Sequence, residues 1–194
     1  IKEGKVGTKE LDEKVSNVLR LIFRTSMDPH KPFGSLGSPE HGQAGRKIGE
    51  EGVVLLQNKD NILPIDLNKA KKIAVIGENA IKMMTVGGGS SSLKVKYEIS
   101  PLDGLKSRVG SKAEVVYARG YVGDPTGEYN GVKTGQDLKD NRSEDELLAE
   151  AFQVAKDADY VIFFGGLNKS NHQDCEDSDR ASLGLPYAQD LSLI

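Results

Sequence analysis

The feature that most constrains the fold is an apolar run, Tyr160 to Phe164, that no polar residue interrupts. A short continuous run of this kind is typical of a parallel strand covered on both faces of its sheet. Gly165 and Gly166 end the run, and a polar loop rich in acidic residues follows. In an open α/β sheet, the loop that leaves the carboxyl end of a buried strand is the usual place for a ligand or for chemistry.

Two further apolar runs, 71–77 and 114–118, have the same character, and helical segments separate the three. A proline opens the expected short helix over 101–109, and Ser143 with Glu146 three residues later forms a capping box for the next helix. Strands that alternate with helices indicate βαβ units. The sequence therefore predicts an α/β fold with an open, mostly parallel sheet and helices on both faces, to which a longer chain would add strands.

The N-terminal part of the chain reads differently. Residues 10–23 carry apolar side chains at helical spacing, which predicts an amphipathic helix whose apolar stripe needs a partner surface. Residues 25–39 hold three prolines and few apolar residues, which is typical of a linker. Ser38 is the expected N-cap of a second helix that runs to about Asn58. We therefore expect an appendage, a linker and one main domain.

The composition excludes several classes of protein. The chain has 194 residues and a formal net charge of −3, so it lacks the basic surface expected of a nucleic-acid-binding protein. No apolar run approaches the roughly 20 residues that cross a bilayer, so no membrane segment is expected. Cys175 is the single cysteine, which leaves no intrachain disulfide and no cysteine-rich zinc site.

A glycine-rich segment follows the first apolar run, but it does not fit the nucleotide-binding motifs. After Gly77 come Glu78, Asn79 and Ala80 instead of the remaining glycines of a dinucleotide fingerprint, and Glu78 would repel a pyrophosphate. The later GGGSSS run lacks the lysine of a phosphate-binding loop. It is either a plain turn or a backbone that approaches a polar ligand, with Ser90 and Ser91 as hydrogen-bond donors.

The loop after the third apolar run contains four acidic residues: Asp174, Glu176, Asp177 and Asp179. They do not follow the spacing of an EF-hand. Three interpretations stay open, namely a solvated surface loop, a calcium site, or a general acid in a loop that Asp179 and Arg180 hold. His172 is either a surface residue or a ligand or base. The residues alone thus also allow a non-catalytic nucleotide- or sugar-binding module, or a structural domain that binds calcium.

Five segments together carry a family likeness. In chain order they are VSNVLRLIF, SPEHGQAGRKIGEEGVVLLQNKDNILPI, KKIAVIGENA with GGGSSSL, ISPLDGLK, and CEDSDRASLGLP. In this order they resemble glycoside hydrolase family 3, the β-glucosidase and exo-glycosidase family. The first is similar to the last helix of that family's barrel domain, and the last is similar to its E-G-x-D-R…L-P segment. Each motif alone is weak, but five in the correct order are specific.

The resemblance implies a (β/α)₈ barrel followed by an α/β sandwich. Residues 1–24 would be the C-terminal helix of the barrel, 25–39 a linker, and 40–194 a sandwich domain truncated at its C-terminus. The implied activity is that of a retaining, β-glucosidase-like hydrolase that releases terminal sugars. Its partners would be an oligosaccharide or glycoside substrate and the missing barrel, with no cofactor, metal, nucleic acid or membrane. A periplasmic or secreted location is suspected from the family alone.

Residue by residue, the family's acid/base glutamate falls on Glu176, while its nucleophile aspartate lies in the barrel, outside this chain. Ser90 matches a sugar-contacting serine, with Ser91 beside it. Asp177 stands where the family has glycine, and its charge would oppose ionisation of Glu176, so Asp174 is the alternative acid/base. Because double displacement also needs a nucleophile, the resemblance implies that this chain alone is inactive.

Overall fold

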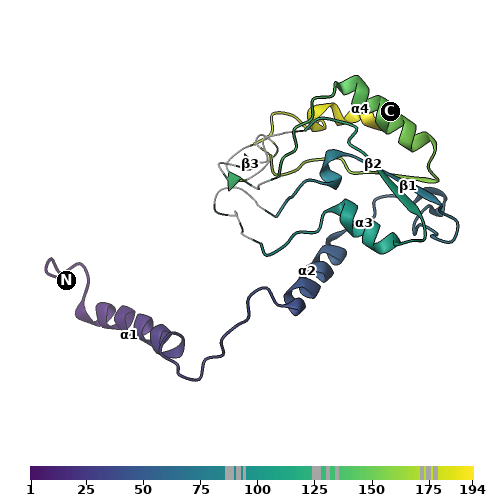
Figure 1. Ribbon diagram of the computed structural model, residues 1–194. Helices are drawn as coiled ribbons and strands as arrows, with labels where there is room; N and C mark the ends of the chain where they lie inside the picture. Colours follow the sequence, from purple (N-terminus) through teal and green to yellow (C-terminus); the bar gives the residue numbers. More distant parts are fainter. Residues whose placement is uncertain are drawn as a thin grey trace. The chain divides into compact units, whose positions relative to one another are not determined.

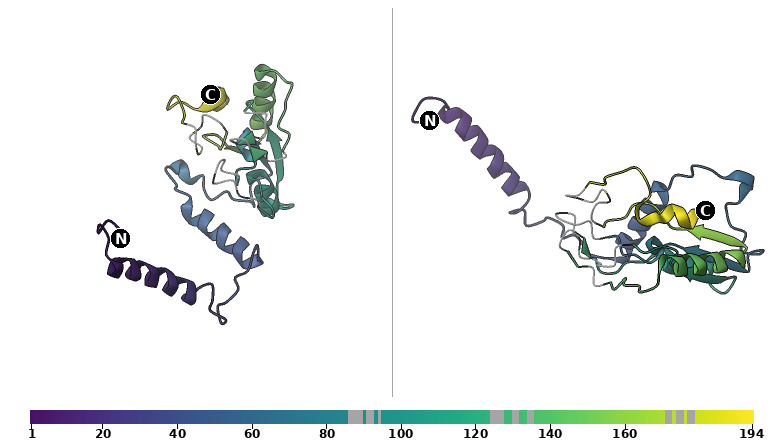
Figure 2. Two further views of the ribbon diagram at one scale, coloured as in Figure 1. Left: turned by 90° about the vertical axis from the view of Figure 1, so that its left-hand side faces the viewer. Right: turned by 90° about the horizontal axis from the view of Figure 1, so that it is seen from above.

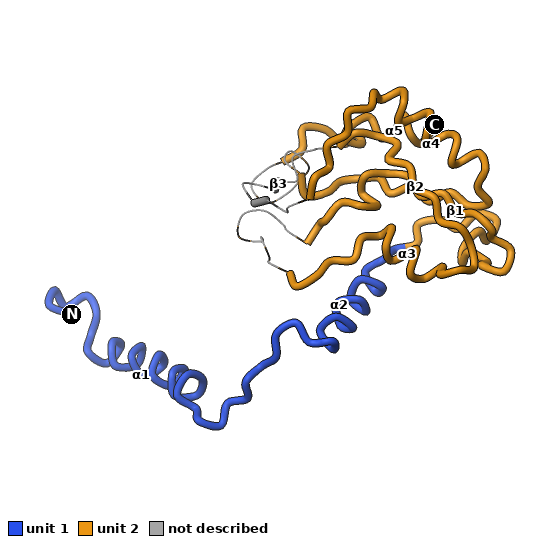
Figure 3. The backbone as a smooth tube through the Cα atoms, viewed as in Figure 1, with its two compact units in different colours: residues 1–54 blue, residues 55–194 orange. Residues whose placement is uncertain are grey.

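The computed structural model in Figure 1 describes residues 1–85, 90, 93, 95–123, 128–129, 132–133, 136–170, 173, 176 and 179–194. The chain divides into two compact units, residues 1–54 and residues 55–194 (Figure 3). The first unit consists of two helices and the segment between them, and the second contains the sheet.

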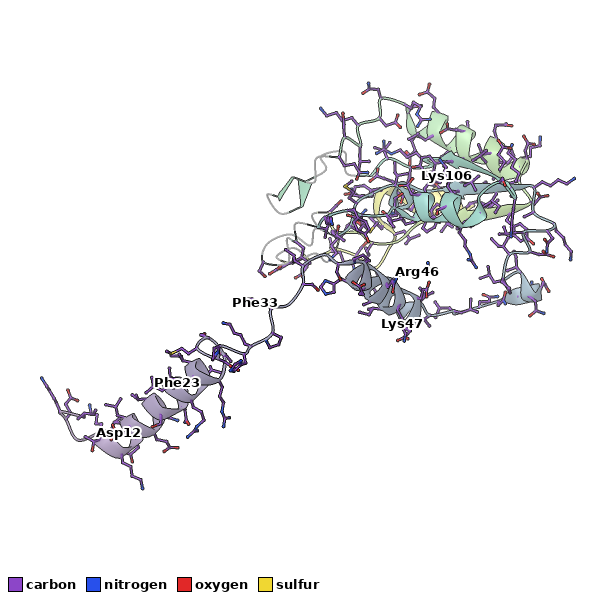
Figure 4. The ribbon with its side chains drawn as sticks, turned by 60° about the horizontal axis from the view of Figure 1, so that its bottom comes forward. Asp12, Phe23, Phe33, Arg46, Lys47 and Lys106 are labelled. Carbon is purple, nitrogen blue, oxygen red and sulfur yellow. The ribbon has the colours of Figure 1, made fainter. Side chains whose placement is uncertain are left out.

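The first unit contains α1 (Thr8–Arg24) and α2 (Pro39–Gly52), and no residue of either helix is buried. Both helices were predicted, and the Ser38 hydroxyl accepts a hydrogen bond from the backbone N–H of His41, as expected of an N-cap. The apolar stripe of α1 is exposed, including Phe23, and so is Phe33 in the following segment (Figure 4). The predicted extension of α2 to Asn58 is wrong, because the chain becomes extended at the β-branched Val53.

The second unit is built on three parallel strands: β1 (Lys72–Ile76), β2 (Glu114–Ala118) and β5 (Tyr160–Phe163). Their order is β2-β1-β5, with Val75 of β1 paired to Tyr117 on one side and Ile162 on the other. This arrangement confirms the predicted open parallel sheet and its three strands. A short antiparallel pair, β3 (Glu128–Tyr129) and β4 (Val132–Lys133), was not predicted.

Helices lie against both faces of the sheet, as predicted (Figure 2). Alternate residues of a strand point to opposite faces. On one face Val75 packs with Leu102 of α3 (Pro101–Val109), and on the other Ile76 packs with Ala151 of α4 (Glu144–Lys156). The short helix α5 (Gln189–Leu193) follows the last loop, and 3₁₀ turns lie at Lys59–Asn61, Glu78–Ala80 and Pro186–Ala188.

The strand β5 is less covered than its sequence suggests. Four of the five residues of β1 are buried, but Val161 of β5 is 50% exposed. Among the described residues, β5 pairs with β1 alone and forms an edge of the sheet. The prediction that the Tyr160 to Phe164 run is covered on both faces is therefore wrong in this structure. An apolar run reports the preference of the strand for burial, and it does not report how many neighbours the strand has.

Candidate active site

The carboxyl ends of the three strands lie at one edge of the sheet, and each leads into a polar loop. Gly77 ends β1 with a φ of 120°, and a Cβ there would lie 2.2 Å from the carbonyl oxygen of Phe164. Only glycine fits this close approach between the ends of β1 and β5. The edge thus brings together the segments that begin at Gly77, at Arg119 and at Gly165.

A buried ionic cluster joins the first two of these segments. The Glu78 carboxylate is fully buried, and it accepts hydrogen bonds from Arg119 (Nη2, 2.5 Å; Nε, 3.2 Å), from Lys82 Nζ at 3.2 Å and from the backbone N–H of Gly123 at 2.8 Å. From the sequence we expected Glu78 to repel a pyrophosphate. Its charge is instead offset by two buried cations, so the argument against a dinucleotide site rests on the missing glycines.

The cluster continues outward to α4. Asp140 accepts from Arg119 Nη1 at 3.4 Å and from Arg142 Nη2 at 2.7 Å, and Arg142 also donates to Glu150 of α4 at 2.6 Å. The hydrogen bonds from the Arg142 guanidinium hold the pKa of Asp140 well below its usual range. This chain of charges fixes the end of the 119–142 segment.

Buried side-chain amides connect the end of β1 with the loop that follows β5. Asn168 Nδ2 donates to Asn79 Oδ1 at 3.0 Å, and Asn79 Nδ2 donates to the carbonyl of Gly166 at 3.2 Å. The Tyr121 hydroxyl accepts from the backbone N–H of Asn79 at 3.2 Å and donates to the Phe164 carbonyl at 3.1 Å. Burial raises the pKa of Tyr121 to about 12, so this hydroxyl remains a donor even in alkaline solution.

The structure brings together two of the three predicted site residues. Ser90 donates a hydrogen bond from its hydroxyl to Glu176 Oε1, across a sequence separation of 86 residues. Glu176 is exposed, as is Asp179, while Arg180 is partly exposed. Ser91, His172, Asp174 and Asp177 lie outside the described residues.

Two further contacts hold the segment that carries Ser90, and sequence analysis missed both. The Glu98 carboxylate accepts from the backbone N–H groups of Met84 at 2.5 Å and Thr85 at 3.4 Å, which closes the base of this segment. The side chain of Gln136 accepts from Met83 N at 2.9 Å and donates to Ile81 O at 2.7 Å. Neither residue belongs to a motif, and polarity alone does not distinguish a residue that holds a loop from one that faces solvent.

The described residues lack two features that would indicate another class of protein. Among the residues that the structure describes, no group of three or more His, Cys, Asp or Glu side chains is placed to hold a metal ion. In the same part of the chain, no helix combines the length and the apolar character needed to cross a membrane. The chemistry that the described site offers is that of a hydroxyl beside an exposed carboxyl.

The fold and this edge define an α/β sheet module with polar loops at the carboxyl ends of its strands. Residues 53–194 match the model of the glycosyl hydrolase family 3 C-terminal domain. The chain therefore belongs to glycosyl hydrolase family 3 and carries its C-terminal domain, which confirms the resemblance.

Relatives with known names agree with this assignment. The chain is 44% identical to the beta-glucosidase BoGH3A of Bacteroides ovatus over 97% of its own length and 25% of that protein's. It is 30% identical to a beta-xylosidase of Formosa agariphila, with coverage of 91% and 23%. The crystal structure of a GH3 beta-glucosidase from Bifidobacterium adolescentis is similar with a TM-score of 0.72 and 28% identity, over 99% of this chain and 24% of that one. The chain thus spans about a quarter of the length of these relatives.

Proposed function

We propose that Glu176 is the acid/base carboxyl of a retaining, β-glucosidase-like glycoside hydrolase. The observation that supports this role is the hydrogen bond from Ser90 to Glu176. It joins the two loops that contain the residues matching the family's serine and glutamate, although these loops are far apart in sequence. The family membership and the beta-glucosidase relatives favour a glycoside as the substrate.

In the proposed reaction, an aspartate of a barrel domain outside this chain attacks the anomeric carbon. The carboxyl of Glu176 donates its proton to the glycosidic oxygen as that bond breaks. Glu176, now a carboxylate, then takes a proton from the water that hydrolyses the glycosyl-enzyme ester. The Ser90 hydroxyl donates to Glu176 Oε1, and this contact would orient the carboxyl group toward the reacting oxygen.

The same proposal assigns the parts of the chain. Residues 1–24 are the terminal helix of the barrel, 25–39 a linker and 40–194 the sandwich domain, with Ser90 and Ser91 facing the sugar. The exposed apolar stripe of α1 supports the first assignment, because exposed leucine, valine and phenylalanine side chains in a row favour a partner surface. The 119–142 segment would border the sugar subsites.

The test of Glu176 is its replacement by glutamine in the complete enzyme, with Asp174→Asn and Asp177→Asn as matched controls. Glutamine keeps the shape but cannot transfer a proton, so kcat/KM for a β-linked disaccharide should fall about 10²–10⁴-fold. Activated aryl glucosides should lose less in the first step, and azide should accelerate their turnover and give a glycosyl azide of retained configuration. Near-normal disaccharide turnover, or azide rescue in Asp174→Asn instead, would exclude Glu176 as the acid/base.

A second test uses the 194-residue chain itself. Because it carries one of the two proposed carboxyls, it should release no aryl group from an aryl β-glucoside, even at high enzyme concentration. If hydrolytic activity copurifies with the chain through several columns, so that no contaminant explains it, the nucleophile must lie within these residues.

A further inference from the structure

The loop that carries Glu176 is closed at its base by one buried side chain. Gln189 Oε1 accepts from the backbone N–H of Gly166 at 2.7 Å, and Gln189 Nε2 donates to the Gly166 carbonyl at 3.1 Å. Gln189 is fully buried. The two ends of the loop are therefore held against each other by a side chain that satisfies both polar groups of one residue, Gly166.

A second contact attaches this closed base to the centre of the sheet. Asn79 lies three residues after the end of β1, and its backbone N–H donates to the Tyr121 hydroxyl. Its side chain donates to the Gly166 carbonyl and accepts from Asn168 Nδ2. Asn79 and Asn168 are both buried, so water does not compete for these bonds and each one restricts the loop more than a surface hydrogen bond would.

From Asn168 the hydrogen bonds continue toward Glu176. The Asn168 backbone N–H donates to Gln173 Oε1 at 3.1 Å, and Asn168 Oδ1 accepts from the backbone N–H of Ser170 at 2.8 Å. Gln173 is buried and lies three residues before Glu176. Three residues span at most about 11 Å when extended, so fixing Gln173 confines the position of Glu176.

We infer that Asn168 is a positioning residue for Glu176, an inference that rests on the proposed acid/base role. Its side-chain Nδ2 holds the segment after β1 and its Oδ1 holds Ser170, while its backbone N–H holds Gln173. Aspartate would keep the acceptor for Ser170 but could not donate to Asn79. A displacement of the acid/base by about 1 Å is enough to slow a positioned proton transfer by roughly 10²-fold.

The experiment is a double-mutant cycle in the complete enzyme with Asn168→Ala, Glu176→Gln and the combined variant. Asn168→Ala should lower kcat/KM about 10- to 100-fold for a β-linked disaccharide and only a few-fold for dinitrophenyl β-glucoside, whose leaving group needs no proton. In the Glu176→Gln background, the same change should cost no more than about twofold, because the group that it positions is already disabled. Asn168→Asp keeps the Ser170 contact and provides a second variant with the same selective loss.

Leu147→Ala is the matched control, since Leu147 is a fully buried residue of α4 whose apolar side chain forms no hydrogen bond of this path. This variant should lower thermal stability and change kcat/KM by the same factor for both substrates. That factor should be the same in the parent enzyme and in the Glu176→Gln background. If Asn168→Ala behaves like Leu147→Ala, Asn168 acts on stability alone and the inference is wrong, while the role of Glu176 stands. If Glu176→Gln itself leaves disaccharide turnover near normal, the proposed function fails first, and the inference fails with it.

Discussion

Replacing Arg119 with leucine tests the buried ionic cluster. The Arg119 side chain is 6% exposed and supplies two of the hydrogen bonds to the Glu78 carboxylate, which is itself fully buried. Without Arg119, Glu78 keeps Lys82 and the Gly123 N–H, but it loses its shortest contact. Breaking one partner of a buried ion pair costs about 3–5 kcal/mol, because the remaining charge stays out of water.

That loss is large compared with the 5–15 kcal/mol stability of a typical domain. For a chain of this size, each 1 kcal/mol shifts the melting temperature by about 3 °C, so Arg119→Leu should lower Tm by roughly 10–15 °C. Tyrosine fluorescence is the appropriate probe. All six tyrosines lie in residues 55–194 and the chain has no tryptophan, so the signal reports the unfolding of the second unit alone.

Arg142→Leu is the control, because Arg142 belongs to the same network but its side chain is 41% exposed. Water screens the ion pairs of this exposed guanidinium more than those of Arg119, so Arg142→Leu should lower Tm by less than Arg119→Leu does. If Arg119→Leu costs no more than Arg142→Leu in urea unfolding, water reaches Glu78 in the variant and the argument from burial is refuted.

Two further predictions concern the same unit. Because the folded pKa of Asp140 lies below the roughly 3.9 of an unfolded aspartate, its stabilising effect is complete above about pH 5 and is lost as the pH falls toward the folded value. The urea midpoint of Asp140→Asn should therefore lie below that of the parent at pH 7, and the difference should shrink steadily as the pH falls below about 4; a constant difference would contradict this. Gly77→Ala should cost at least about 1–3 kcal/mol, because of its positive φ and the close Phe164 carbonyl, whereas Gly184→Ala, which has room for a Cβ, should be nearly neutral in the same measurement.

The parts of the fold that were predictable are those that neighbouring residues determine. The Ser143–Glu146 capping box is present as expected, with Glu146 N donating to Ser143 Oγ at 3.2 Å and Ser143 N donating to Glu146 Oε2 at 2.7 Å. The three strands of the parallel sheet were equally evident, because each is a short apolar run. The bounds of α2 were not, since Val53 and Val54 continue the apolar spacing of a helix while their β-branched side chains favour an extended backbone.

The candidate site was predictable only in part, because most of its contacts join residues that are distant in sequence. Asn79 and Asn168 are 89 residues apart, and Glu78 and Arg119 are 41 apart. Such contacts depend on where two loops end relative to the sheet, which periodicity does not encode. One signal was available: Glu78 and Asn79 directly follow a buried strand, where a polar side chain is either exposed to a ligand or buried with partners.

The central strand β1 gives these contacts a common origin, and two successive residues after it serve different purposes. Glu78 ties β1 to the segment that follows β2, through charges that are matched and buried. Asn79 ties β1 to the loop that follows β5, through amides whose geometry extends to within three residues of Glu176. Because the described hydrogen bonds of Arg119 run to Glu78 and Asp140 and not to Asn168, Arg119 should affect stability without changing the dependence on the leaving group. A change at Asn168 should alter that dependence in addition to any loss of stability, so the two sets of variants separate the support of the sheet edge from the placement of the proposed acid/base.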